Sequence, residues 1–349
     1  MSPSITVGFP HAPLRSGGPG SFQTRLMSEL RALGHTVVLP ESRITPDVIV
    51  VVGGTQKIAW LWRCKARGAR VVHRLGGMNW RHCVMNMPRR VHLLGIARNR
   101  VMAFIRNHLA DYVVYQSEFV QDWWHTAQRS SNCPERVIYN GVDLNEFTPA
   151  RRKENCQNQA GLLCVEGNID DDPVVLDILT SVSEELTKIA GSPSVRLYGR
   201  VSNSARERLD NVDGISMPGT VLRDEMPDVY SRGRAFLSLD VNAACPNTVI
   251  ESLASGLPVV GFDTGALPEL VPSEAGIIVP FGGDPWQLQR ADTKALVSAA
   301  SDLLSAADGF RLAARAVAEE RFGLDKMVES YMDVFNQVLD GRQHRGVGS

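Results

Sequence analysis

The chain has 349 residues, of which 44% are hydrophobic and 21% are charged; this composition is typical of an ordinary soluble protein with room for two domains. No apolar run approaches the roughly 20 residues that a membrane-spanning helix needs. Residues 1–4 lead directly into a predicted strand, so we expect no signal peptide and a cytoplasmic location. The six cysteines form no CxxC pair and no metal-binding spacing, which favours free thiols in a reducing compartment.

Charge is distributed unevenly along the chain. Residues 1–150 contain 18 Lys and Arg against 9 Asp and Glu, and residues 151–349 contain 19 against 29, so the two halves carry +9 and −10. This asymmetry indicates separate domains with different partners. The basic half suits an anionic acceptor or an anionic membrane surface. The alternative is that the opposite charges attract the two domains to each other across a cleft.

Apolar runs alternate with helical patterns over residues 1–150, which predicts an α/β domain with a parallel sheet. A glycine loop, Gly17–Gly20, follows the first strand and precedes a helix over Ser21–Leu33. Glycine at Gly17, Gly18 and Gly20 would let a ligand approach the backbone closely, and an ordinary tight turn is the alternative. The strands predicted in this half are Ile5–Phe9, Thr36–Leu39, Val48–Val52, Arg70–Arg74, Tyr112–Gln116 and Val137–Asn140.

A polar linker after Pro149 separates this pattern from a second α/β pattern. Asp170–Asp172 precede a predicted helix over Pro173–Ile189, where acidic residues cap the backbone and suit the helix dipole. A Mg²⁺ or Mn²⁺ site is the alternative for this acidic run. A long amphipathic helix over Phe322–Leu339 closes the pattern. The strands predicted in this half are Leu162–Glu166, Val195–Tyr198, Ile215–Met217, Ala235–Leu239 and Val259–Phe262.

Basic residues at predicted strand ends are candidates for ligand contact. Arg74 and Arg200 are candidate clamps for phosphate or carboxylate, because a guanidinium binds both bidentately. His73 is a candidate catalytic group, and a structural histidine is the alternative.

Residues 88–109 form a basic amphipathic pattern. Such a helix can lie on anionic lipid, and the alternative is a solvated face over a core stripe. Its basic residues are Arg89, Arg90, His92, Arg98, Arg100, Arg106 and His108.

The segment Cys245–Val271 is the most informative part of the chain. Asn247 predicts a helix cap, Gly256 a left-handed helix stop, and Leu257–Phe262 a strand that is buried on both faces. Helix N-termini at the carboxyl ends of parallel strands suit phosphate. Glu251 lies one turn inside the helix, where a carboxylate can accept hydrogen bonds from a ribose diol. The segment therefore predicts a nucleotide site.

Four parts of the chain, taken together, resemble the retaining nucleotide-sugar glycosyltransferases of family 4, also called glycosyltransferase group 1. They are the opening glycine loop with LMSELRALGHTVV, YQSEFVQDWW with VIYNGVDLNEFTP, PNTVIESLASGLPVVGFDTGALPELV with GIIVPFGGDP, and RFGLDKMVESYMDVF. The resemblance implies a GT-B fold, in which two Rossmann-like domains with parallel sheets face each other across a cleft. We expect an acceptor domain over residues 1–150 with a crossing helix over 322–340, a donor domain over 151–321, and a flexible tail over 341–349.

The resemblance also implies roles for individual residues. Glu251 matches a glutamate that binds ribose hydroxyls, and Asn247 and Thr248 match donors to the diphosphate. The loop Gly265, Ala266 and Leu267 matches one near the donor sugar and phosphates. Gly18 and Gly20, beside Gly17, match a loop near the diphosphate or acceptor.

Three positions depart from the family pattern. Ala243 stands where the family has its first motif glutamate, eight residues before Glu251. Gly167 and Asn168 stand where a basic pair is usual, and we include them among the donor-binding candidates. Gly76 is nearest the position of a histidine that is common in the family's first domain.

We therefore expect a hexosyltransferase that uses a nucleoside diphosphate sugar and a glycan or glycolipid acceptor, with retention. We expect no metal, no further cofactor and no nucleic-acid partner. Peripheral contact with the inner face of the membrane is one interpretation of the basic charge of residues 1–150. The alternatives are a nucleotide-binding or partner-binding pseudoenzyme and, with less support, a sugar-nucleotide epimerase. An NAD-dependent oxidoreductase is disfavoured because the glycine loop lacks GxGxxG.

Overall fold

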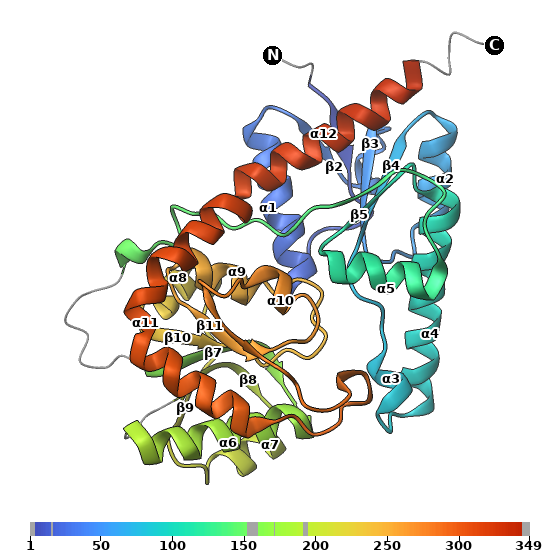
Figure 1. The fold of residues 1–349 in the computed structure, drawn as a ribbon. Helices are drawn as coiled ribbons and strands as arrows, with labels where there is room; N and C mark the ends of the chain where they lie inside the picture. Colours follow the sequence, from blue (N-terminus) through green and yellow to red (C-terminus); the bar gives the residue numbers. More distant parts are fainter. Residues whose placement is uncertain (1–3, 15–16, 152–159, 171, 191–194, 344–349) are drawn as a thin grey trace. The chain divides into compact units, whose positions relative to one another are not determined.

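The structure is a computed structural model that describes residues 4–14, 17–151, 160–170, 172–190 and 195–343 (Figure 1). The chain divides into two compact units: unit 1 combines Met1–Gly141 with Leu324–Ser349, and unit 2 is Val142–Gly323. The division at Gly141 falls close to the boundary predicted at residue 150. Within the described ranges, no helix is both long and apolar enough to cross a membrane.

Unit 1 is built on a six-stranded parallel sheet with the order β2-β1-β3-β4-β5-β6. The order reverses between β1 and β3, and in open α/β sheets ligands bind outside the carboxyl ends of the strands at such a switch point. The strands are β1 (Thr6–Gly8), β2 (Thr36–Val38), β3 (Val48–Val52), β4 (Arg70–Leu75), β5 (Tyr112–Tyr115) and β6 (Glu135–Val137).

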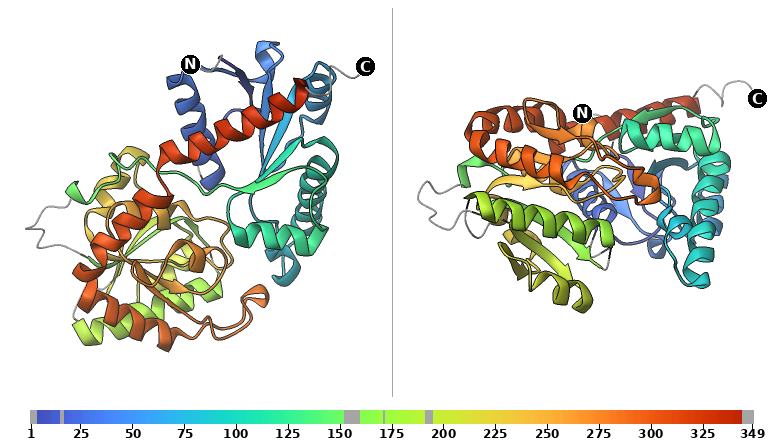
Figure 2. Two further views of the ribbon diagram at one scale, coloured as in Figure 1. Left: turned by 45° about the horizontal axis from the view of Figure 1, so that its top comes forward. Right: turned by 60° about the horizontal axis from the view of Figure 1, so that its bottom comes forward.

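Helices pack against both faces of the unit 1 sheet. Val48, Val50 and Val52 of β3 join the core on the side of α1 and α12, whereas Ile49 and Val51 join the core under α2 and the end of α4; this alternation follows from the period of two along a strand. Figure 2 shows α12 running beside α1. The helices are α1 (Gly18–Ala32), η1 (Pro40–Ser42), α2 (Ile58–Ala66), α3 (Arg81–Val84), α4 (Arg89–Phe104), the π-helical turn η2 (Ile105–Leu109), α5 (Glu118–Gln128) and α12 (Leu324–Gln343).

Unit 2 has a second six-stranded parallel sheet, with the order β12-β11-β10-β7-β8-β9. Read from β9, and counting strands from the first of this unit, the order is 3-2-1-4-5-6, which is that of the dinucleotide-binding fold, and its switch point lies between β7 and β10. The strands are β7 (Ala160–Ile169), β8 (Val195–Val201), β9 (Ile215–Gly219), β10 (Gly233–Leu237), β11 (Val259–Phe262) and β12 (Gly276–Val279).

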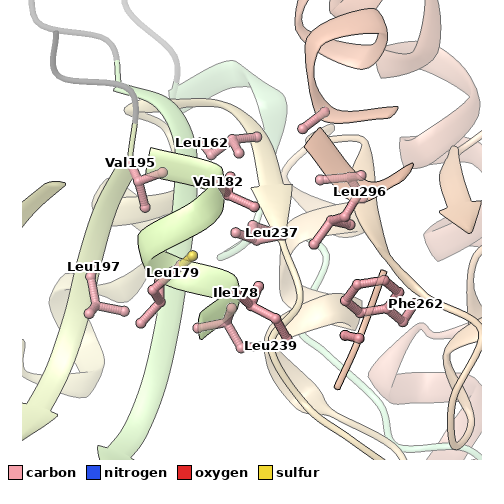
Figure 3. Packing of buried hydrophobic residues seen from close by; sticks show 14 of the residues in the cluster. Leu162, Ile178, Leu179, Val182, Val195, Leu197, Leu237, Leu239, Phe262 and Leu296 are labelled. Carbon is pink, nitrogen blue, oxygen red and sulfur yellow. The ribbon is translucent and has the colours of Figure 1, made fainter. Parts of the chain in front are cut away.

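The main core of unit 2 lies between this sheet and helices α6 and α11. Figure 3 shows Ile178, Leu179 and Val182 of α6 packing against leucines of the sheet, with Phe262 and Leu296 beside them. The helices are η3 (Pro149–Arg151), α6 (Pro173–Ala190), α7 (Asn203–Leu209), η4 (Arg223–Glu225), α8 (Met226–Tyr230), α9 (Asn247–Ala254), α10 (Leu267–Leu270), η5 (Pro285–Gln287) and α11 (Thr293–Arg321).

The predicted elements agree best with the structure where a strand is buried on both faces. Val48–Val52 and Val259–Phe262 have the predicted bounds. The last strand of unit 1 begins and ends earlier than predicted, at Glu135–Val137. Helix α11, with 29 residues, was not predicted. The expected tail over 341–349 begins inside α12, which ends at Gln343, and residues 344–349 lie outside the described residues.

Candidate functional site

Three connections at the carboxyl edge of the unit 2 sheet carry most of the predicted donor-binding residues. One lies at the end of β7, one runs from β10 into α9, and one follows β11. Strands β7, β10 and β11 are neighbours in the sheet and parallel, so these ends lie along a single edge on either side of the switch point.

Helix α9 begins as predicted but is capped differently. Its N-cap residue is Pro246, whose side chain makes no capping hydrogen bond. Asn247 and Thr248 are the first two helical residues, both half-buried, so the prediction that Asn247 caps this helix is wrong. The partial positive charge at the first turn of α9 suits an anionic group.

The end of α9 is a Schellman motif. The Gly256 N–H donates to the Leu253 carbonyl and the Leu257 N–H to the Ser252 carbonyl, both at 2.9 Å. Gly256 has a φ of 69°, as the predicted left-handed stop requires. The helix is therefore fixed at its C-terminal end by backbone bonds, and strand β11 follows directly.

Glu251 lies one turn inside α9 and is nearly buried, with 9% of its surface exposed. Its Oε2 accepts a hydrogen bond from the hydroxyl of Tyr230, at 3.1 Å. Tyr230 is the last residue of α8 and is fully buried. A carboxylate so held is suited to accept hydrogen bonds from a neutral diol.

The connection after β11 packs directly on the connection after β10. Gly265 has a φ of 60°, and a Cβ on it would lie 2.5 Å from both the backbone N and the O of Ala243. The Ala266 N–H donates to the Ala243 carbonyl at 2.9 Å. The side chains of Ala266 and Leu267 are buried, so their predicted contact with a donor would run through the backbone.

Asn242, just before Ala243, is an unexpected feature of this edge. It has a φ of 55°, a left-handed conformation that asparagine tolerates better than most residues. Its side chain is buried, and Nδ2 has no hydrogen-bond partner. No pattern in the sequence indicated this residue.

The expected loop after β7 is part of the strand. β7 continues to Ile169 with a bulge between Val165 and Asn168. Asn168 pairs with Arg200 of β8 and accepts a 2.9 Å hydrogen bond from its Nε through Oδ1. Gly167 and Asn168 thus form a strand end, and Arg200 is exposed beside them; their contact with a donor stays a prediction.

Asp172, the last residue of the acidic run, caps helix α6. Asp172 Oδ1 accepts hydrogen bonds from the N–H groups of Val174 and Val175, at 3.0 and 3.5 Å. Asp171 lies outside the described residues. In the part of the chain that the structure describes, no group of three His, Cys, Asp or Glu side chains is placed to hold a metal ion.

In unit 1, the structure places His73 and Arg74 inside the protein. His73 is fully buried, its Nε2 lies 2.7 Å from the Gly53 carbonyl, and burial lowers its pKa to about 4. Arg74 Nη2 donates to Gln116 Oε1 at 2.7 Å and to Asn140 Oδ1 at 2.6 Å, and its guanidinium lies 3.8 Å from the centre of the Phe22 ring. These contacts hold β4 to its neighbours, and a role in catalysis stays a prediction for both residues.

The predicted glycine loop of unit 1 is the first turn of α1. Gly17 is the N-cap residue, with a φ of 86°, and the helix starts at Gly18 rather than Ser21. A Cβ on Gly20 would collide with the Leu14 carbonyl oxygen. Glycine at position 20 is thus explained by the close approach of the preceding loop. Pro19 fits the first turn of α1 because an N–H there would have no acceptor within the helix.

Helix α4 combines exposed arginines with exposed apolar side chains. Val91, Leu93 and Leu94 are 44%, 55% and 46% exposed, whereas Arg106, beyond the helix end, is buried and donates to the Tyr115 hydroxyl. The exposed arginines of α4 are Arg89, Arg90, Arg98 and Arg100.

Comparison with known proteins agrees with this architecture. Residues 167–306 match the family model described as Glycosyl transferases group 1. The chain is 29% identical over 152 residues to a GDP-mannose-dependent alpha-mannosyltransferase of Mycobacterium tuberculosis, covering 41% of this chain and 37% of the relative. It is 26% identical over 170 residues to the sulfoquinovosyl transferase SQD2 of Arabidopsis thaliana, covering 46% and 32%. The aligned segments thus span well under half of these two relatives.

Solved structures match over nearly the whole chain. A sucrose-phosphate synthase from Thermosynechococcus elongatus has a TM-score of 0.76 at 15% identity, covering 97% of this chain and 100% of that one. HepE of Anabaena, solved with UDP and glucose, has a TM-score of 0.70 at 15% identity, covering 95% and 100%. The chain therefore has the GT-B fold, with two parallel six-stranded sheets, and residues 167–306 match a glycosyl transferases group 1 domain.

Proposed function

We propose that the chain is a glycosyltransferase that moves a hexosyl group from a nucleoside diphosphate sugar to a glycan or glycolipid acceptor, with retention. The observation that carries the proposal is the nearly buried Glu251 one turn inside α9, a helix that begins at the carboxyl edge of the unit 2 sheet. Phosphate fits the first turn and a ribose diol fits the carboxylate. The group 1 match over residues 167–306 includes this helix.

In the proposed reaction, the bond between the anomeric carbon and the diphosphate oxygen breaks as the acceptor hydroxyl forms a new bond to that carbon. Positive charge develops on the sugar ring and negative charge on the diphosphate. The first-turn N–H groups of α9 point toward that negative charge, and stabilisation of a leaving group in this way lowers the barrier. Arg200, exposed at the end of β8, is the proposed further cation.

The relatives differ in donor and acceptor, so the proposal names neither base nor sugar. One relative is described as GDP-mannose-dependent, another as a sulfoquinovosyl transferase, and a third, from Streptomyces bingchenggensis, as a D-inositol 3-phosphate glycosyltransferase. HepE was solved with UDP. The descriptions of the mannosyltransferase and of HepE both mention a nucleoside diphosphate group, which is also the ligand proposed for α9.

A thermal-shift screen with UDP, GDP, ADP and NAD tests the donor site. Stabilisation by a bound ligand follows mass action, so a ligand concentration of about 100 times Kd adds about 2.7 kcal/mol to the free energy of unfolding. We expect one nucleoside diphosphate to raise the melting temperature, and Glu251→Ala to abolish the rise. Glu207→Ala, at an exposed glutamate of α7, is the matched control and should keep it. A preference for NAD, or an unchanged shift in Glu251→Ala, would overturn the proposal.

A second candidate, a nucleotide-binding pseudoenzyme, is favoured by Ala243. Its backbone is packed against Gly265, and it has no carboxylate to offer a sugar. The two candidates differ in turnover, which release of nucleoside diphosphate from the preferred sugar nucleotide measures. We expect slow release by the wild-type protein even without acceptor. Binding with no release across a panel of sugars and acceptors would favour the pseudoenzyme.

We also propose that α4 makes peripheral contact with an anionic membrane, which would bring a glycolipid acceptor to unit 1. Its exposed arginines suit anionic headgroups, and its exposed Val91, Leu93 and Leu94 suit contact with lipid. Flotation with phosphatidylglycerol vesicles should carry the protein upward, and changing Arg89, Arg90, Arg98 and Arg100 to Ser should prevent it. Wild-type protein that stays at the bottom of the gradient would contradict this part of the proposal.

A further inference from the structure

The segment 144–147, near the start of unit 2, is joined to the C-terminal end of helix α9 and to Tyr230. Arg315 of α11 joins them: its Nη1 donates to the carbonyls of Phe147 and Ala254, at 2.7 and 2.6 Å, and its Nη2 donates to the Leu144 carbonyl at 3.0 Å. Ala254 is the last residue of α9. A cation at the C-terminal end of a helix is favourable, so Arg315 holds the segment 144–147 against the end of α9.

The same segment contacts Tyr230, whose hydroxyl donates to Glu251 of α9. The rings of Phe147 and Tyr230 meet edge to face, with centroids 5.7 Å apart, and Phe236 of β10 lies 6.0 Å from Tyr230. Phe147, Tyr230 and Phe236 are all buried. The Tyr230 ring is therefore wedged between two aromatic rings, and its hydroxyl is aimed at Glu251.

A glutamate side chain has several rotatable bonds, and fixing it costs conformational entropy. A hydrogen bond from a hydroxyl to a carboxylate is stronger than one between neutral groups. Because the Tyr230 ring is buried in contact with Phe147 and Phe236, this bond favours one orientation of the Glu251 carboxylate before any ligand arrives. A carboxylate has about four acceptor positions, and the bond from Tyr230 occupies one of them.

We propose that Tyr230 is a positioning residue that orients the Glu251 carboxylate toward the 2′ and 3′ hydroxyls of the nucleoside diphosphate. The inference rests on the proposed function, since it takes Glu251 as the ribose ligand. Under this proposal, the preference of the protein for ribose over deoxyribose depends on Tyr230, which does not itself contact the nucleotide. Phe147, in the segment 144–147 of unit 2, supports Tyr230 in that role.

The test compares two ligands in isothermal titration calorimetry: the nucleoside diphosphate that the wild-type protein prefers and its 2′,3′-dideoxy counterpart. The wild-type protein should prefer the ribonucleotide. Tyr230→Phe keeps the ring contacts and removes the hydroxyl, and it should reduce that preference by about tenfold. Affinity for the dideoxy ligand should stay unchanged, which a merely structural defect would not allow.

Three further variants sharpen the result. Glu251→Ala should lose the preference, and adding Tyr230→Phe to it should change nothing more, because the two groups act as one unit. Phe147→Leu should also reduce the preference for the ribonucleotide. This variant tests the proposal if the Tyr230→Phe protein fails to fold. Tyr112→Phe, at a buried tyrosine of β5, is the control and should behave as wild type.

The outcomes separate this inference from the proposed function. Equal losses of affinity for both ligands in Tyr230→Phe, or an unchanged preference, would overturn the positioning role while leaving the nucleotide site in place. If the wild-type protein binds both ligands equally, Glu251 does not bind the ribose hydroxyls. A wild-type protein that binds no nucleoside diphosphate would overturn the proposed function itself.

Discussion

The buried residue His73 makes the free energy of unfolding depend on pH. Burial lowers its pKa from 6.5 to about 4, so the unfolded chain takes up this proton at a higher pH than the folded protein does. Protonation therefore favours unfolding, and the free energy of unfolding falls as the pH drops from 6.5 toward 4. Between about pH 7.5 and pH 5, this residue should lower it by about 2 kcal/mol.

Urea denaturation at both pH values measures the effect. His73→Gln should show a weaker pH dependence than wild type, and His108→Gln, at an exposed histidine, should show the same dependence as wild type. Equal pH dependence in His73→Gln and wild type would mean that His73 has the same pKa in the folded and the unfolded protein, which would contradict this account.

Gly265 fixes the contact between the connections after β10 and β11. Its φ of 60° and the 2.5 Å approach of a Cβ to the Ala243 backbone leave no room for a side chain. Gly265→Ala should lower the free energy of unfolding by about 2 kcal/mol or more and weaken nucleotide binding. Gly309→Ala, in an exposed part of α11 with nothing within 4 Å of its Cβ, should instead stabilise by up to about 1 kcal/mol. Equal effects of the two substitutions in denaturant melts would contradict this account.

At the scale of elements, Arg315 joins α11, α9 and the segment 144–147. Its side chain is 18% exposed, and its removal leaves three backbone carbonyls without that donor. Arg315→Ala should lower the free energy of unfolding by about 2–4 kcal/mol. Arg290→Ala removes an ion pair to Asp177 from a side chain that is 81% exposed and should cost less than about 1 kcal/mol. Similar losses in the two variants would show that the three bonds contribute little.

Sequence patterns predicted the elements that have a strong apolar signal. Val48–Val52 and Val259–Phe262 are continuous apolar runs, buried on both faces, and their bounds are as predicted. Helix α11 was not predicted, because much of its buried face is alanine, at Ala299, Ala300, Ala307, Ala314 and Ala318, and alanine gives a weak periodic signal. The extension of β7 was missed because its bulge interrupts the alternation of a regular strand.

The site was predicted only where its residues are neighbours in sequence. Glu251 and Gly256 lie in one motif, so their places on α9 and at its end followed from helix geometry. Tyr230 and Arg315 contact that motif from α8 and α11, and nothing in a single sequence pairs residues so far apart. Asn247 was assigned to the cap because asparagine favours that position, although here Pro246 occupies it.

At the scale of the whole molecule, the last helix returns the chain to the unit where it began. α12 contributes Val328, Tyr331 and Phe335 to the core of unit 1, while the chain between Val142 and Gly323 forms unit 2. Each unit thus has its own sheet and core, and the chain passes from one to the other twice. The proposed division of labour puts the donor in unit 2, where Glu251 lies, and the acceptor in unit 1, as the resemblance to the glycosyltransferases implies.

The central claim is that a nucleoside diphosphate binds at α9 with its ribose on Glu251. A crystal structure with the nucleoside diphosphate that best stabilises the protein tests this claim most directly. We predict ribose hydroxyls within hydrogen-bond distance of the Glu251 carboxylate and the diphosphate at the first turn of α9, beside Asn247 and Thr248. A nucleotide bound instead at the first turn of α1 in unit 1, with Glu251 out of reach, would contradict it.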